Sequence, residues 1–242
     1  MHSSHTSVLR PLLISLAMAC SAVSSQAADA FTDAVSLAYA PYRSALFRTN
    51  SQAQTESEQA IAQARAAWDG VRQRFGAQPP APYDRDAHFA QTLQAVDGVY
   101  RQAADEIAAK QLTKAHETLE AVRDLLAEQR QRNGVVVFSD HVNAYHAAME
   151  HTLANGPTLL AQSDGALQLM AQVGVLQHLA QRLRQQAPAT LLQQPAFTEL
   201  LDALDASVTT LRQATLRQDV NAMRSALGQL KAPFSRLFLR FG

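Results

Sequence analysis

Two histidine–glutamate pairs are the residues of this sequence best suited to chemistry. His116 precedes Glu120 and His146 precedes Glu150, each by four positions. On a helix this spacing places both side chains of a pair on one face. Imidazole nitrogen and carboxylate oxygen are common ligands of zinc, iron and copper. The sequence therefore predicts a transition-metal site (Cu, Zn or Fe) with candidate ligands His116, His146, Glu150 and Glu120, and with His141 and His151 in reserve.

The distance between the two pairs depends on the helices that carry them. If segments 112–132 and 136–154 are antiparallel neighbours, His116 and His146 point into one interface. Counted from Gly134, the two imidazoles are then offset by about 9 Å along the axis, at a rise of 1.5 Å per residue. The alternative interpretation is that these histidines are solvated or cap helices, and bind no metal.

The N-terminus has the pattern of a secretory signal peptide, which we assign to residues 1–30. Arg10 precedes a short apolar stretch, and the small residues of Ser25-Gln26-Ala27 suit cleavage. We therefore expect a periplasmic or secreted protein. The single cysteine, Cys20, lies inside this segment. A lipoprotein anchored at Cys20 is the alternative. If cleavage falls later, the mature chain has no thiol for disulfides, metal binding or covalent haem attachment.

Composition narrows the classes of function. The 242 residues carry 21 basic and 21 acidic side chains, and 47% are hydrophobic. A neutral chain without a basic run gives no support to nucleic-acid binding. Outside the signal segment, no apolar stretch reaches the roughly 20 residues of a membrane span. Gly-x-Ser-x-Gly and glycine-rich phosphate loops do not occur in the sequence. We therefore expect a binding protein rather than an enzyme.

Apolar residues recur at steps of three and four over most of the chain, which predicts an all-α fold. Proline-containing breaks at 78–82, 155–157 and 188–195 separate the helices, and Pro233 should kink or split the last one. We expect about eight helices in four antiparallel hairpins: 31–49 with 53–75, 84–109 with 112–132, 136–154 with 158–187, and 196–216 with 218–240.

An internal repeat relates these hairpins. A shift of 58 residues carries Tyr42 onto Tyr100, Arg65 onto Arg123 and Trp68 onto Leu126 without a gap. A further shift of 108 carries the second copy onto the last hairpin. The pattern predicts two tandem four-helix units, residues 31–134 and 135–242.

An exported, repeated helical hairpin with internal histidines resembles the periplasmic four-helix bundles of the cytochrome b562 and cytochrome c′ type. The resemblance covers architecture, best over residues 31–134. The Cys-x-x-Cys-His signature of cytochrome c′ is absent from this sequence, and the axial Met and His of the b-type bundle have no counterparts at the ends of either half. Haem binding is therefore not implied by the resemblance.

Three functions remain open at this point. The first is a non-enzymatic transition-metal-binding or accessory protein of the periplasm. The second is a ligand-free scaffold whose helical faces dock another envelope protein. The third is a b-type haem carrier, for which Met170 and His178 would be the axial residues.

Overall fold

The all-α fold predicted from the sequence is confirmed. The structure, a computed structural model, describes residues 29–242, and this range contains no strand. Its helices are α1 (Ala30–Asn50), α2 (Gln54–Phe75), α3 (Phe89–Ala108), α4 (Leu112–Arg132), α5 (Phe138–Leu159), α6 (Gly165–Gln186), α7 (Ala189–Leu192), α8 (Pro195–Leu216), α9 (Val220–Gln229) and α10 (Lys231–Phe241). The predicted signal peptide and Cys20 lie outside the described residues, apart from Asp29, whose carboxylate caps α1, and Ala30.

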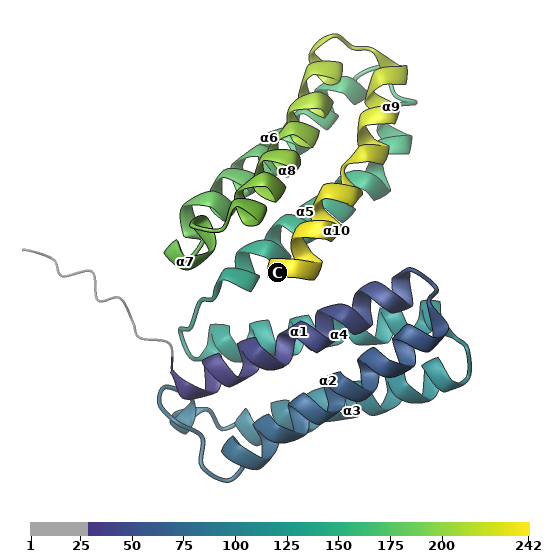
Figure 1. Ribbon diagram of the computed structural model, residues 1–242. Helices are drawn as coiled ribbons and strands as arrows, with labels where there is room; N and C mark the ends of the chain where they lie inside the picture. Colours follow the sequence, from purple (N-terminus) through teal and green to yellow (C-terminus); the bar gives the residue numbers. More distant parts are fainter. Residues whose placement is uncertain (1–28) are drawn as a thin grey trace, which may run out of the picture.

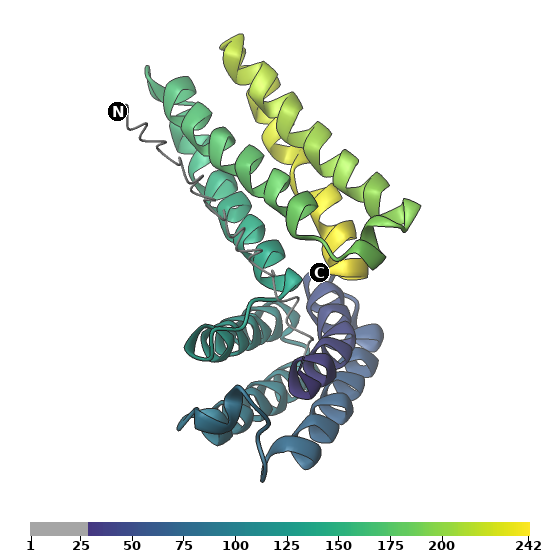
Figure 2. The same ribbon diagram turned by 90° about the vertical axis from the view of Figure 1, so that its left-hand side faces the viewer.

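The helices group into two bundles. In the first bundle, α1 packs against α2 and α4, and α3 packs against the same two helices. In the second bundle, α6 lies between α5 and α8, and α9 and α10 complete it against α5 and α8. Figure 1 shows that the helices of the two bundles run in different directions, and Figure 2 shows one bundle stacked on the other. Helix α10 also packs against α1 and so joins them.

Aromatic residues fill the centre of the first bundle. Tyr42, Trp68 and Tyr100 are each at most 3% exposed. Two of them make buried hydrogen bonds: the Tyr42 hydroxyl donates to the Leu119 carbonyl, and the Trp68 indole N–H donates to the Leu93 carbonyl. Large buried rings of this kind contribute much of the hydrophobic stabilisation of a small bundle. Of the helices between residues 29 and 242, none has the length and apolar character that crossing a bilayer requires.

The turns that close three of the hairpins share one backbone geometry. Gln52, Lys110 and Gln218 have φ angles of 56°, 59° and 52°, the left-handed conformation that ends a helix in the Schellman motif. In each turn the amide of the following residue bonds to the carbonyl five positions earlier. These residues are separated by the same shifts, 58 and then 108, that relate the repeated sequences. The repeat is therefore present in the backbone as well as in the apolar pattern.

Three predicted helix boundaries are wrong. The break expected at 155–157 does not occur: α5 continues to Leu159, and the next helix, expected from residue 158, begins at Gly165. Gly156 lets α9 approach closely, since a Cβ there would lie 2.7 Å from Cδ1 of Leu227, and Pro157 falls in the last turn, where the helix is about to end. The helix expected from residue 84 begins at Phe89, after the short 3₁₀ turn Tyr83–Arg85. The split expected near Pro233 occurs, with α9 ending at Gln229 and α10 beginning at Lys231.

The left-handed turns predict a stabilising substitution. A residue with a Cβ is strained at positive φ, so Lys110→Gly should raise the free energy of unfolding by about 0.5–1 kcal/mol. Lys110→Ala removes the same charged side chain but keeps the Cβ, and should bring no such gain. Urea unfolding of both variants measures the difference. Equal stabilities of the Gly and Ala variants would contradict the assignment of strain to this turn.

Candidate functional site

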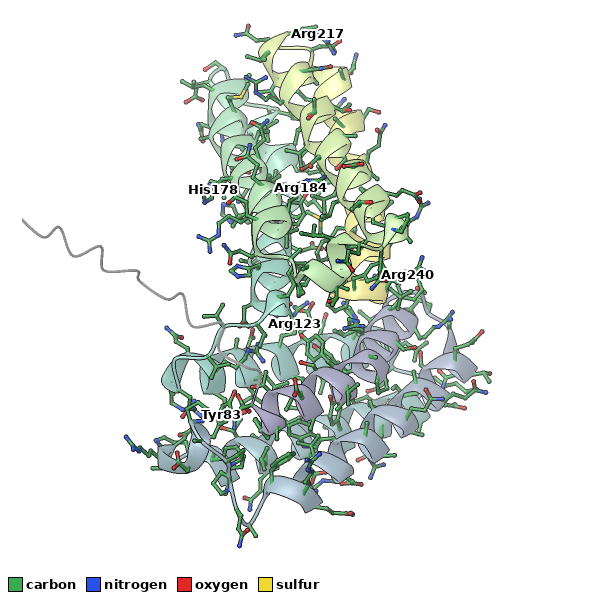
Figure 3. The ribbon with its side chains drawn as sticks, turned by 60° about the vertical axis from the view of Figure 1, so that its left-hand side comes forward. Tyr83, Arg123, His178, Arg184, Arg217 and Arg240 are labelled. Carbon is green, nitrogen blue, oxygen red and sulfur yellow. The ribbon has the colours of Figure 1, made fainter. Side chains whose placement is uncertain are left out.

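A cavity of about 380 Å³ lies between the two bundles, and four of the predicted ligands line it. His116 and Glu120 come from α4, and His146 and Glu150 from α5. We call it the histidine cavity. Its remaining wall consists of two cations and of residues from α1 and α10: Arg123, Lys231, Leu46, Phe47, Asn50, Phe234, Ser235 and Phe238. Figure 3 places Arg123 at the junction of the bundles.

The helices position these side chains through their buried stripes. On α4, Leu119 and Val122 are fully buried, which leaves His116, Glu120 and Arg123 on the flank that faces the second bundle. On α5, Tyr145 and Met149 are fully buried in the same way, and their neighbours His146 and Glu150 line the cavity. The condition under which the sequence placed both pairs in one interface, that these helices are antiparallel neighbours, does not hold. Helix α4 packs on α3 and α1, and α5 packs on α6 and α9, so the two pairs meet across the junction of the bundles.

Arg123 connects the two bundles by hydrogen bonds. Its Nη1 lies 3.0 Å from Nδ1 of His146, and its Nη2 donates to Oε1 of Glu120, also over 3.0 Å. The side chain of Arg123 is only 14% exposed, so water competes weakly for these contacts. A guanidinium has donors alone. Nδ1 of His146 therefore accepts, and in the neutral ring the proton lies on Nε2.

His146 is held on its other sides as well. Its ring stacks on Phe234 with the centroids 5.0 Å apart and an angle of 11° between the planes. Its Nε2 lies 3.5 Å from Oε1 of Glu150, and Nζ of Lys231 lies 3.2 Å from the same oxygen. The hydrogen bond from His146, together with the charge of Lys231, lowers the pKa of Glu150 to about 2. Glu150 therefore stays ionised at neutral and mildly acidic pH.

His116 has a different arrangement. Its Nδ1 lies 3.1 Å from the carbonyl oxygen of Leu46, which can only accept, so Nδ1 donates and Nε2 carries the lone pair. That Nε2 lies 3.7 Å from Oε1 of Glu120. Burial lowers the pKa of His116 below its usual value, against the opposing effect of Glu120. The imidazole is therefore neutral at pH 7, with its lone pair next to a carboxylate.

The other predicted histidines do not line the histidine cavity. His141 lies in the first turn of α5, where burial lowers its pKa. His151 is exposed and contacts Asn155. His178, the residue considered for haem, is exposed on α6, and in Figure 3 it points away from the second bundle. The structure thus brings together four of the six predicted ligands and separates the two in reserve.

Within residues 29–242, no three His, Cys, Asp or Glu side chains are arranged to hold one metal ion. The two pairs line one cavity but do not converge on a common point. Arg123, Lys231 and Phe234 line the cavity as well but were not predicted as site residues. Arg123 had a signal, since it follows Glu120 by three positions and so shares its helix face. Lys231 and Phe234 had none, because they lie 85 and 88 residues from His146 along the chain.

Comparisons with protein-family models, with curated proteins and with solved structures found no match to this chain.

The low pKa of His116 predicts a loss of stability on mild acidification. The unfolded residue titrates near pH 6.5, above its pKa in the fold. Between these two values the unfolded chain binds the extra proton, so the stability contributed by neutral His116 is complete above about pH 6.5 and declines as the pH falls. His116→Asn retains a donor for the Leu46 carbonyl but does not titrate. The melting temperature of this variant should fall less between pH 7 and pH 5 than that of the wild type.

The exposed His151 supplies the control. His151→Asn should follow the wild-type pH dependence, because this side chain lies outside the histidine cavity. A His116→Asn variant that follows the wild-type profile would contradict the account of His116.

Proposed function

We propose that this chain is an exported, non-enzymatic binding protein that takes a transition-metal ion in the histidine cavity, first at His116 and Glu120. The observation that supports the proposal is the fixed tautomer of His116. A histidine that donates its other ring N–H to a backbone carbonyl is oriented as metal-binding histidines usually are. His116 meets this condition, because its Nδ1 donates to the carbonyl of Leu46. Its free Nε2 lies next to the carboxylate of Glu120, and the side chain lines the cavity.

The spacing of the pair supports a shared ion. Two ligand atoms on one tetrahedral zinc ion lie roughly 3.4 Å apart at bond lengths of about 2.0–2.2 Å. Nε2 of His116 and Oε1 of Glu120 are 3.7 Å apart, so a small rotation of either side chain is enough. Waters would complete the coordination, and we therefore expect weak binding.

The second pair can join only at a cost. Nε2 of His146 carries the proton while Nδ1 accepts from Arg123. To bind an ion at Nε2, His146 must exchange tautomers and lose this hydrogen bond. An ion that recruits His146 would therefore separate Arg123 from α5 and weaken the contact between the bundles. A metal ion and Arg123 therefore compete for the imidazole of His146.

A scaffold without a ligand is the second candidate function. The observation that favours it is that the charged groups of the cavity already have partners: Glu120 contacts Arg123, and Glu150 contacts Lys231. A network that is satisfied in this way can hold two bundles together without any ion. The protein would then dock another envelope protein through its helical faces.

Titration with zinc or copper separates the two candidates. If the metal proposal holds, the melting temperature of the wild type rises with metal concentration, as expected for a ligand that binds the folded state. His116→Asn should abolish most of this rise, because Asn keeps the contact to Leu46 but has no lone pair at the position of Nε2.

His151→Asn is the matched control, since it removes an exposed imidazole outside the cavity. It should leave the metal response intact. A wild-type melting temperature that ignores both metals would remove the metal proposal and leave the scaffold. Equal losses in the two variants would locate the binding elsewhere.

A further inference from the structure

The outward face of α6 is uncharged over most of its length. Helix α6 packs on α5 and α8, and residues 165–181 contain no Asp, Glu, Lys or Arg. A helix at the surface of a monomeric protein normally carries charged residues on its outward face. Here two large hydrophobic side chains are strongly exposed instead, Leu167 at 75% and Val175 at 52%. Exposed apolar surface on one helix face is typical of an interaction site.

The exposed residues of this face repeat at the spacing of a coiled-coil seam. Leu167, Ala171, Gly174 and His178 follow one another at steps of four, three and four, as the a and d positions of a heptad do. All four are exposed, and Figure 3 shows His178 pointing away from the second bundle. Ala171 and Gly174 are small, so a second helix can approach closely at the middle of the face. We call Leu167, Ala171, Gly174, Val175 and His178 the α6 seam.

Opposite charges stand at the two ends of the α6 seam. Asp164 precedes the first turn of α6, and Arg182 lies near its C-terminal end. They are seven residues before and eleven residues after Ala171, so both lie on its side of the helix. Both are exposed. The Asp164 carboxylate accepts a hydrogen bond from Gln168, but neither charged residue forms an ion pair within residues 29–242, unlike the nearby Arg184.

This arrangement of charges matches a second copy of α6 that runs antiparallel. In a two-fold interface the same surface patch contacts itself on both copies. When the pairing is centred on residue 173, Ala171 meets Val175 of the second copy, and Asp164 meets Arg182 of the second copy. Each dimer then contains two such ion pairs, about 27 Å apart along the helix at a rise of 1.5 Å per residue. A parallel pairing would instead place like charges together.

We propose that this chain forms a homodimer through the α6 seam, with the two α6 helices antiparallel and Asp164 of each copy against Arg182 of the other. The histidine cavity shares no residue with the seam, so the dimer is independent of the proposed metal site. Most stable complexes bury roughly 1,200–2,000 Å² and use about 20–30 residues a side, more than one pair of helices offers. We therefore expect a weak, reversible dimer.

Sedimentation equilibrium from about 5 to about 500 µM tests the proposal. The wild type should change from monomer to dimer across this range. Val175→Glu places two carboxylates beside the centre of the pairing and should weaken dimerisation at least about tenfold. Leu37→Glu is the matched control, because Leu37 is a 79% exposed hydrophobic side chain on α1, outside the seam. It should leave the dimer affinity within about twofold. Circular dichroism spectra should show that both variants keep the wild-type helix content.

Charge reversal tests the orientation of the two helices. Asp164→Lys and Arg182→Glu each replace two attractive contacts in the dimer by repulsive ones, and each should weaken dimerisation at least about tenfold. The double variant Asp164→Lys/Arg182→Glu restores opposite charges and should return the affinity to within about threefold of the wild type. The side chain of Asp164 makes no capping hydrogen bond to α6, so its replacement removes none.

Three results would overturn the proposal. The first is a wild type that remains monomeric at about 500 µM. The second is a dimer that Val175→Glu and Leu37→Glu weaken equally, which would place the contact elsewhere. The third is a double charge-reversal variant that dimerises as weakly as the two single variants, which would contradict the antiparallel pairing.

Discussion

The guanidinium of Arg123 is the constraint on which the rest of the site depends. It donates to Glu120 of its own helix and to His146 of the second bundle. Helices α4 and α5 do not pack side by side, and the other polar contact between them is the buried ion pair of Arg130 with Asp140. The hydrogen bond from Arg123 to Nδ1 fixes the tautomer of His146. The ring proton then lies on Nε2, which faces Glu150. One arginine thereby orders side chains from both bundles. Its counterpart in the first copy of the repeat, Arg65, is exposed.

Two cavities lie between the bundles, because two bundles whose helices run in different directions cannot close their contact completely. Helix α10 packs on α1, and Arg43 donates to the backbone carbonyls of Leu239 and Gly242 at the end of α10. On one side of this contact lies a cavity whose charged groups are satisfied by one another. On the other side lies a second cavity, which shares no lining residue with the first. The first can take an ion at His116 and Glu120 after a small side-chain rotation, whereas recruiting His146 breaks its hydrogen bond with Arg123.

Most of the fold could be predicted from the sequence, because the long helices have apolar stripes and breaks separate most of them. The shift that carries Tyr42 onto Tyr100 also relates the turns at Gln52 and Lys110. The continuation of α5 through Pro157 was not predictable, since Asn155-Gly156-Pro157 is a sequence typical of a helix break. The spacing predicted that His116 shares a helix face with Glu120 and His146 with Glu150, but not that the two pairs line one cavity across the junction of the bundles. Their partners on α10 could not be predicted, because the stacking of Phe234 on His146 joins residues that are far apart in the chain.

A double-mutant cycle between Arg123 and His146 tests the central claim most directly. The single variants are Arg123→Met and His146→Phe, the second of which keeps a ring to stack on Phe234. Unfolding free energies of the wild type, the two single variants and the double variant give the coupling energy. If the contact joins the bundles, the coupling should be favourable by about 1 kcal/mol or more. Effects that add to within about 0.5 kcal/mol would contradict the account.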